Sequence, residues 1–290
     1  MTAHKSDPFF KKMKTISYQG EPGAWSDIAC RAMFPGLKSV PCRGFEDAFK
    51  AVKDGRADLA MIPVDNTLAG RVADVHHLIP KGDLYIVGEH FQPIQMALLG
   101  VKGAKIGDLT DVYSHIHALP QCRKIIRKLG LNAHVAADTA RAAADVAEWG
   151  DKTKAAIASP LNAKIYGLQV LEEGIQDAEN NVTRFQVWAG EPNLPKKGER
   201  GTYITSFIFG VRNIPAALYK ALGGFATNGV NVTKIESYID QRLNAAQFLC
   251  EVEGHPDDVA LKNALEELNF FASHVRMLGT YKGHSFRAKG

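Results

Sequence analysis

The sequence has few cysteines and lacks the cysteine pairs typical of zinc or redox motifs. Its four cysteines, at positions 30, 42, 122 and 250, lie far apart, and no C-x-x-C occurs. Scattered cysteines of this kind are expected to stay reduced thiols in a cytoplasmic protein. Long apolar runs are also missing: the N-terminal stretch carries lysines but no apolar core, and no later run is long enough to span a membrane. We therefore expect a cytoplasmic protein without an export signal or membrane contact.

The charge balance excludes a second group of functions. The 290 residues carry a formal net charge of only +4, with 46% hydrophobic and 23% charged residues. Basic residues form no stripe interleaved with aromatic residues, so nucleic-acid binding is not expected. The G-x-G-x-x-G fingerprint of dinucleotide-binding proteins is absent as well. A weak positive charge suits a small anionic substrate, although ordinary surface composition explains it equally well.

Apolar spacing predicts alternating strands and helices over the first two thirds of the chain. Strand patterns cover residues 14–18, 59–64 and 155–158, and helical spacing appears over residues 28–33 and 45–52. A further apolar helix face joins Leu119, Cys122, Ile126 and Leu129. This alternation, which continues to about residue 189, predicts an α/β architecture with largely parallel sheets.

The composition changes between residues 190 and 202, where prolines, glycines and charges predict a linker. The remaining chain predicts the order β-α-β-β-α-β, which is the ferredoxin-like pattern. Its strands are expected at residues 203–210, 232–238, 246–252 and 275–281, with helices around residues 218–225 and 261–268. The predicted organisation is a mobile tail (1–13), a first, α/β domain (14–190), a linker (191–201), a second domain (202–282) and a tail (283–290).

Four segments place glycines or small polar residues where strands should end, which is where open α/β sheets bind ligands. In the first, around Gly20 and Gly23, the glycines let backbone amides approach a ligand; a plain strand-to-helix turn capped by Ser26 explains it too. In the second, Asp65 or Thr67 could simply cap a helix, but Arg71 is also well placed to bind a carboxylate through its guanidinium group.

The third and fourth segments contain the remaining candidates. Ser114 is expected to be a helix N-cap, and His115 and His117 lack the third ligand that a metal site would need. In the fourth segment, Asn181 and Thr183 share one face of an expected strand while Arg184 points to the other. A polar pair that enters a buried strand favours function over structure. The Asn-Val-Thr sequon in this segment means little without an export signal.

These four segments, taken in order, resemble the prephenate dehydratase family. The family has a glycine-rich first loop, then P-x-E-N-S-x-x-G, S-H-P-Q-A-L-x-Q-C and N-x-T-R-F motifs. The similar segments here are residues 20–26, 63–70, 114–122 and 181–185. The resemblance covers residues 14–190 and implies two α/β lobes, similar to periplasmic binding proteins, with the active site in the cleft between them.

Residues 202–282 resemble the ACT domain that these enzymes carry, with similarity to its G-A-L-V and E-S-R-P motifs. The resemblance implies allosteric binding of phenylalanine by Pro215, Ala216, Ala217, Leu218, Asn231, Glu236 and Ser237. ACT domains usually pair between subunits, so a homodimer or homotetramer is implied.

The implied reaction converts prephenate into phenylpyruvate with loss of carbon dioxide and water, and needs no metal or organic cofactor. The catalytic residues implied are Thr183, Asn181, Ser114 and His115. The substrate-binding residues implied are Gly23, Ala24, Ser26, Asp65, Asn66, Thr67, Arg71, Arg184 and Phe185. Thr183 is expected to donate a hydrogen bond to the leaving hydroxyl group. Among the ligands, Arg71 and the amides of residues 23–26 should hold the pyruvyl carboxylate, whereas Arg184 is expected to act more as a structural tie.

Several positions depart from the family pattern. Ala24 replaces a threonine, Asp65 and Thr67 replace glutamate and serine, and Ile116-His117 replaces Pro-Gln. In the ACT motif Tyr238-Ile239 replaces Arg-Pro. Two alternatives remain open. One is an arogenate dehydratase, whose plant members have a similar first loop, and the other is a non-catalytic amino-acid sensor that keeps the same domains.

Overall fold

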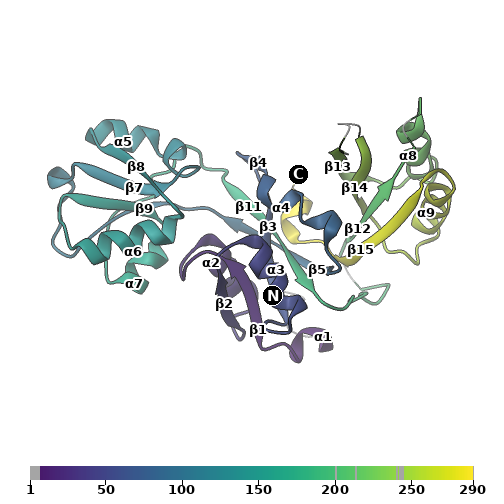
Figure 1. Cartoon of the computed structure of the whole chain (residues 1–290), viewed down its shortest axis with the longest axis horizontal. Helices are drawn as coiled ribbons and strands as arrows, with labels where there is room; N and C mark the ends of the chain where they lie inside the picture. Colours follow the sequence, from purple (N-terminus) through teal and green to yellow (C-terminus); the bar gives the residue numbers. More distant parts are fainter. Residues whose placement is uncertain (1–6, 200, 213, 240, 242–244, 290) are drawn as a thin grey trace. The chain divides into compact units, whose positions relative to one another are not determined.

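The computed structural model describes residues 7–199, 201–212, 214–239, 241 and 245–289 (Figure 1). The chain forms two compact units: Met1–His76 with His90–Phe185, and His77–Glu89 with Gln186–Gly290. Strands β5 (Tyr85–Pro93) and β11 (Val182–Ala189) therefore each run from one unit into the other.

The first sheet has the strand order β2-β1-β3-β11-β5, and the short β4 pairs with β3. Its remaining strands are β1 (Thr15–Gln19), β2 (Lys38–Cys42), β3 (Leu59–Asn66) and β4 (Gly70–Arg71). β1 lies parallel to both β2 and β3, since α2 (Trp25–Met33) and α3 (Phe45–Lys53) provide the crossovers. Both helices begin and end close to the predicted positions.

The second sheet has the order β10-β6-β9-β7-β8 and is mixed, with β6 antiparallel to both of its neighbours. Its strands are β6 (Ala97–Gly100), β7 (Asp111–His115), β8 (Asn132–Ala136), β9 (Lys154–Ala158) and β10 (Gln169–Glu173). One face packs on α5 (Arg123–Leu129), the other on α6 (Thr139–Trp149) and α7 (Pro160–Tyr166). The prediction of α/β lobes is thus confirmed.

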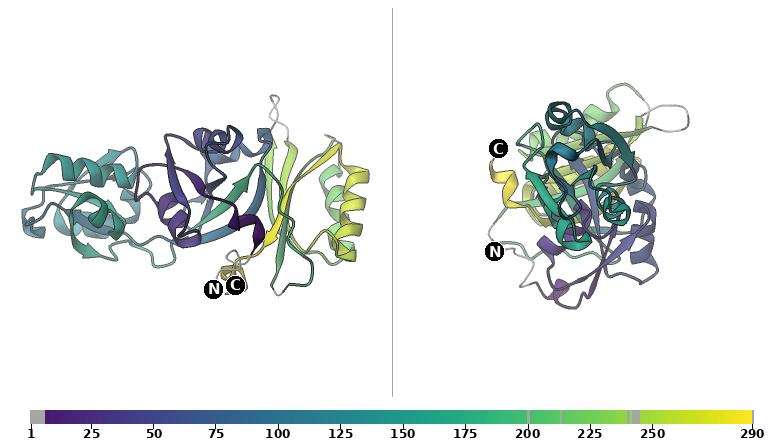
Figure 2. Two further views of the ribbon diagram at one scale, coloured as in Figure 1. Left: turned by 90° about the horizontal axis from the view of Figure 1, so that it is seen from below. Right: turned by 90° about the vertical axis from the view of Figure 1, so that its left-hand side faces the viewer.

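The C-terminal sheet is antiparallel, with the order β13-β14-β12-β15. In chain order its elements are β12 (Tyr203–Gly210), α8 (Ala217–Thr227), β13 (Val232–Ile239), β14 (Ala245–Glu253), α9 (Val259–Phe271) and β15 (His274–Lys282). Both helices cover the same face of the sheet, around a core that includes Phe207, Phe225 and Leu268 (Figure 2). The predicted β-α-β-β-α-β pattern is confirmed.

The N-terminal residues differ from their prediction as a mobile tail. α1 (Pro8–Lys11) is capped by Asp7, whose carboxylate accepts a hydrogen bond from the Phe9 amide at 2.9 Å. Phe10 is buried, and its ring lies 5.3 Å from that of Phe34. The tail prediction is wrong for this helix because burial of the Phe10 ring fixes it, and residues 1–6 lie outside the described part of the chain.

The other short elements are α4 (Ala73–His76), η2 (Ile79–Lys81), η3 (Ile106–Asp108), η4 (Leu119–Gln121) and η5 (Ser285–Lys289). Among the described helices, none has the length and apolar character needed to cross a bilayer.

Candidate functional site

A chain of side-chain amides and a hydroxyl group joins the end of β3 to the start of β11. The Asn66 side-chain nitrogen, at the end of β3, donates to Thr183 Oγ1 at 3.0 Å and to Asn181 Oδ1 at 2.8 Å. Asn181 Nδ2 in turn donates to Gln121 Oε1 at 2.5 Å. The structure therefore brings the second, third and fourth sequence segments together through direct hydrogen bonds.

The turn after β3 fixes which atom of Asn66 faces Thr183. Asn66 Oδ1 accepts hydrogen bonds from the backbone amides of Leu68 and Ala69, each at 2.9 Å. With the oxygen held by these donors, the NH2 group must point towards Thr183 and Asn181. Because Thr183 Oγ1 accepts a hydrogen bond from Asn66, its own hydrogen is left to donate in another direction. The half-buried Thr183 is thus set up as a donor.

Thr67 fastens this turn to the start of β11 and does not cap a helix. Its hydroxyl group donates to the Asn180 carbonyl at 2.6 Å and accepts from the Val182 amide at 2.9 Å. The Thr67 amide also donates to the Val182 carbonyl at 3.0 Å. The capping alternative is wrong for Thr67 because β3 continues to Asn66 and then pairs with β4 instead of entering a helix.

Asp65 and Arg184 form an ion pair beside this cluster. Arg184 Nη1 lies 3.2 Å from Asp65 Oδ2, and the two side chains are 7% and 30% exposed. Asp65 therefore does not cap a helix either. Arg71 is exposed, opposite Asp65 in the β3–β4 pairing, and so is open to an anion. Phe185, predicted to contact substrate, is only 1% exposed and lies in the core, where its side chain offers almost no surface to a ligand.

The third segment is a strand end, not a helix start. Ser114 lies within β7, is fully buried, and donates its hydroxyl hydrogen to the Ile157 carbonyl at 2.6 Å. The prediction that Ser114 caps a helix is therefore wrong, and its hydrogen is already committed to the neighbouring strand. Gln121, at the end of the same segment, contacts Asn181 instead.

His115 ends β7 and carries a lowered pKa. Burial is the main cause, and the nearby His117 lowers the pKa further, while Asp138 and Asp74 act in the opposite direction. His115 Nδ1 accepts a hydrogen bond from the His117 backbone amide at 3.3 Å. The neutral ring therefore carries its hydrogen on Nε2, and His115 can act as a neutral donor at physiological pH.

The first segment is bound to α7 through a hydrogen bond from Asn162 to the backbone of Gly23. Gly23 has φ +90°, its amide donates to Asp27 Oδ2 at 2.9 Å, and its carbonyl accepts from Asn162 Nδ2 at 3.0 Å. Ala24 and Ser26 are both buried at the start of α2. Asp27 Oδ1 and Asn162 Oδ1 are buried atoms without a hydrogen-bond partner. The left-handed conformation at Gly23 thus favours glycine at this position. Near it lie two buried oxygen acceptors without hydrogen-bond partners.

Sequence reasoning missed Gln121 and Asn162. Gln121 lies inside the third segment, but the sequence does not mark it as a site residue, because glutamine has no acid–base or nucleophilic chemistry. Asn162 follows the predicted strand 154–158 in the stretch Ser159-Pro160-Leu161-Asn162. This is again a polar residue after a strand end, so the same criterion would have found it.

The predicted phenylalanine site lies at the start of α8 and on β13. Ala216, the N-cap of α8, has φ +62°, a left-handed conformation that costs an alanine about 1 kcal/mol or more. Glu236 pairs with Lys234 at 2.9 Å, and Asn231 Nδ2 donates to Glu253 at 3.1 Å. The remaining predicted residues, Pro215, Ala217, Leu218 and Ser237, are exposed or partly exposed.

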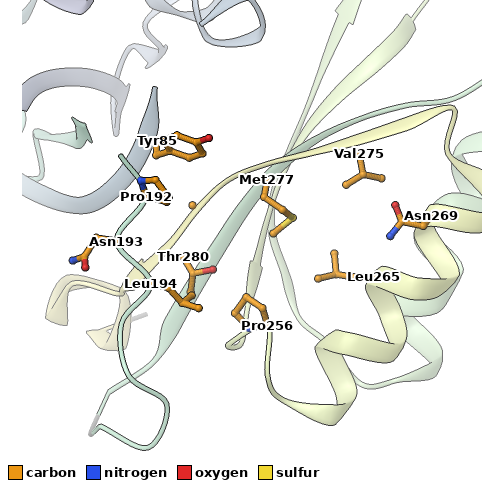
Figure 3. Close-up of a pocket in the computed structure, with 11 residues that line it drawn as sticks. Tyr85, Pro192, Asn193, Leu194, Pro256, Leu265, Asn269, Val275, Met277 and Thr280 are labelled. Carbon is orange, nitrogen blue, oxygen red and sulfur yellow. The ribbon is translucent and has the colours of Figure 1, made fainter. Parts of the chain in front are cut away.

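A cavity of about 450 Å³ lies elsewhere in the C-terminal unit (Figure 3). Its lining is mostly apolar and includes Tyr85, Leu194, Leu265 and Met277. The predicted site residues do not line it. In the described part of the chain, no group of three or more His, Cys, Asp and Glu side chains is arranged to hold a metal ion.

Comparisons with known proteins find similar sequences over most of the chain. The family model described as prephenate dehydratase matches residues 16–193. A bifunctional N-acyl-homoserine lactone acylase/prephenate dehydratase of Komagataeibacter europaeus is 47% identical, covering 95% of this chain and 98% of that protein. The arogenate dehydratase/prephenate dehydratase 1 of Arabidopsis thaliana is 39% identical, covering 92% of this chain and 71% of that protein.

A solved structure of a protein from this family has the same fold as this chain. The prephenate dehydratase of Arthrobacter aurescens, crystallised in complex with L-Phe, is 30% identical to this chain. The two structures align with a TM-score of 0.85, and the alignment covers 93% of this chain and 90% of that one.

Proposed function

Because the chain belongs to the prephenate dehydratase family, we propose that it converts prephenate into phenylpyruvate and that Thr183 assists departure of the hydroxyl group. The ring carboxylate leaves as carbon dioxide, and the electron pair of its C–C bond completes the aromatic ring as the C–O bond of the ring hydroxyl breaks. The departing hydroxide takes up one proton from solution and becomes water. Aromatisation supplies the driving force, so the enzyme mainly has to stabilise the leaving oxygen.

The observation that carries this role is the hydrogen bond from Asn66 to Thr183 Oγ1. It occupies the hydroxyl oxygen as an acceptor and leaves the hydroxyl hydrogen to be donated. A fixed donor of this kind costs no reorganisation when negative charge develops on the leaving oxygen. A threonine hydroxyl is a weak acid, so the proton itself comes from water or a neighbouring group.

The charges around the site suit a substrate with two carboxylates of different fate. Arg71 is exposed. The Gly23 and Ala24 amides already donate to Asp27 and to the Glu21 carbonyl, so the amides that an anion would meet are those of Trp25 and Ser26 at the N-terminus of α2. We assign these groups to the pyruvyl carboxylate. Firm binding of the departing carboxylate would stabilise the ground state and slow decarboxylation, which fits an Arg184 guanidinium already paired with Asp65.

Replacement of Thr183 tests the proposal directly. Thr183→Ala should fold and bind a substrate analogue but lose about 10²–10³-fold in kcat, the usual loss for one aligned donor. Thr183→Ser, which keeps the hydroxyl group, should retain most of the turnover. Thr110→Ala, at an exposed position, is the matched control. Phenylpyruvate formation near the wild-type rate in Thr183→Ala would exclude the assignment.

Arogenate is the alternative substrate, and several relatives carry that name. Its side chain bears an ammonium group where prephenate has a keto group, so recognition calls for a nearby anion. Asp65 is the acid in the second segment, and it already pairs with Arg184. This favours prephenate. Measuring kcat/KM for both substrates tests the preference, and the same assay tests the non-catalytic alternative.

A second activity is a candidate because of the relative from Komagataeibacter europaeus, whose name includes N-acyl-homoserine lactone acylase. The match covers 98% of that protein at 47% identity. We propose testing amide hydrolysis by incubating the enzyme with an N-acyl-homoserine lactone. Release of the fatty acid together with homoserine lactone is the expected result.

We further propose that phenylalanine inhibits the enzyme by binding at the start of α8 and on β13. The left-handed backbone at Ala216 supports a functional loop, because such strain persists where function requires it. The L-Phe complex of the similar Arthrobacter aurescens enzyme supports the choice of ligand. Pairing of two such domains in a homodimer or homotetramer, and a cytoplasmic location, remain predictions from the sequence.

Calorimetry with phenylalanine and analytical ultracentrifugation test this part. Phenylalanine should bind, raise the thermal midpoint and inhibit turnover, and the sedimenting species should be at least a dimer. If phenylalanine does not bind, the Tyr238-Ile239 replacement has removed or changed the ligand, and the regulatory proposal fails.

A further inference from the structure

Two segments of the first sheet belong structurally to the C-terminal unit. Residues 77–89, which lead into β5, and residues 186–189, at the end of β11, cluster with the C-terminal domain. Each lies close in sequence to a site residue. Arg71 is six residues before His77, and Thr183 is three residues before Gln186. A contact that displaces either segment can therefore move the site residue next to it, because only a few residues of backbone join the two.

The first contact is a buried cluster closed by the C-terminal residues. Arg287 in η5 binds both carboxylate oxygens of Glu89, at 2.7 and 2.8 Å, and reaches Glu251 of β14 at 3.3 Å. Gln186 of β11 donates to the other oxygen of Glu251 at 3.0 Å. The Glu89 and Glu251 side chains have no exposed surface. One guanidinium thus joins β5, β14 and, through Glu251, β11.

The second contact is made by β15. The Arg276 guanidinium donates to the carbonyls of Ile79, at 2.9 Å, and Gly82. These carbonyls lie in and just after η2, and the Ile79 carbonyl also accepts the Gly82 amide at 3.3 Å. Three residues later Gly279 faces the Ile86 backbone so closely that an added Cβ would lie 2.0 Å from its carbonyl oxygen. β15 therefore holds residues 79–86 at both ends.

Apolar packing between these contacts is incomplete. The cavity of about 450 Å³ has Tyr85 and the linker residue Pro192 on one side and Met277 and Leu265 on another (Figure 3). A gap of this size removes dispersion contacts around Tyr85. Leu84, Ile86 and Val87 are nevertheless only 1–4% exposed, so the contacts of Arg276 and Arg287 hold the segment together with its apolar packing.

We propose that Arg287 is a positioning residue that couples the regulatory domain to the active site, acting through residues 77–89 and 186–189. A shift of β14 or β15 on binding an effector is passed to Glu89 and Gln186, and along the backbone to Arg71 and Thr183. The C-terminal residues 284–289 then serve as a latch. The coupling to phenylalanine rests on the regulation proposed above, whereas the latch itself does not.

Arg287→Met is the primary test, with Lys262→Met on the exposed face of α9 as the matched control. Removing the guanidinium leaves two buried carboxylates without it, so the thermal midpoint should fall by about 10 °C. Amide hydrogen exchange of residues 84–89 and 186–189 should quicken, while exchange in α9 stays unchanged. Phenylalanine should still bind by calorimetry, but its maximal inhibition should drop roughly fivefold or more.

A second variant separates coupling from stability. Glu89→Gln combined with Arg287→Met removes the guanidinium and the carboxylate that it binds through both oxygens, and leaves the Glu251 carboxylate without Arg287. The double variant should therefore regain part of the lost thermal midpoint and still fail to transmit inhibition. If Arg287→Met keeps wild-type exchange in both segments, the latch is refuted. If exchange changes and inhibition is normal, the coupling is refuted. If the wild-type enzyme does not bind phenylalanine, the proposed regulation fails, and exchange alone decides on the latch.

Discussion

Replacing Asn66 by aspartate keeps the shape of the side chain and reverses what it offers to Thr183. The Asn66 NH2 group donates to Thr183 at 3.0 Å and to Asn181 at 2.8 Å, while its oxygen accepts from two backbone amides. Aspartate keeps the accepting oxygen, so the turn after β3 should form. It has no NH2 group, so the Thr183 hydroxyl should turn and donate to the new carboxylate.

The magnitude follows from the bonds that change. The hydrogen bond to Asn181 is lost and the one to Thr183 only reverses its direction, so the free energy of unfolding should fall by about 1 kcal/mol. Turnover should fall much more, because the hydroxyl hydrogen is diverted from the leaving oxygen. Loss of one aligned donor costs about 3–4 kcal/mol in the barrier, or about 10²–10³ in kcat.

Steady-state measurement of phenylpyruvate formation, together with thermal unfolding, checks both numbers. KM should change little, since Asn66 orients a donor and does not hold the carboxylates. Asn263→Asp, at an exposed position of α9, introduces the same chemical change away from the site and should be neutral. If Asn66→Asp keeps kcat within about threefold of wild type, the orientation of Thr183 by this amide is irrelevant to catalysis.

Three further predictions concern the surroundings of the site. Gly23→Ala should lower the free energy of unfolding by about 1–3 kcal/mol, because φ is +90° and the new Cβ would lie 2.3 Å from an amide oxygen; Gly36→Ala, with open space around it, should not, and thermal melting compares the two. The pKa of His115 is lowered chiefly by burial, so the unfolded state takes up its proton first as the pH falls below about 6.5; the wild type should lose stability from pH 7 to pH 5 more steeply than His115→Gln, and equal slopes would contradict this. Arg184→Met should lower the thermal midpoint by several degrees by leaving Asp65 without its guanidinium, whereas an unchanged midpoint would mean that the pair contributes nothing to stability.

Local sequence was enough to predict most elements of secondary structure. The spacing of apolar residues in α2 and α3, and the strand-like run that became β3, depends on neighbours within one or two turns. The same holds for the β-α-β-β-α-β order of the C-terminal domain. Errors arose where a distant contact decides the structure, as for Phe10, whose burial beside Phe34 orders α1.

For the candidate site, too, some features follow from the sequence and others only from the tertiary structure. The sequence by itself singled out Asn66, Asn181 and Thr183 as candidate site residues. They belong to polar motifs beside predicted strands, and these motifs occur in the same order as in the family. Only the tertiary structure decided which of their atoms meet, that Gln121 bonds to Asn181 and Asn162 to Gly23, and that the Ser114 hydroxyl is already bound to a neighbouring strand. Hydrogen bonds between residues more than 40 positions apart depend on how sheets and helices pack, which no local pattern encodes. For the same reason the sequence predicts a tail at residues 283–290, whereas in the structure Arg287 lies between Glu89 and Glu251.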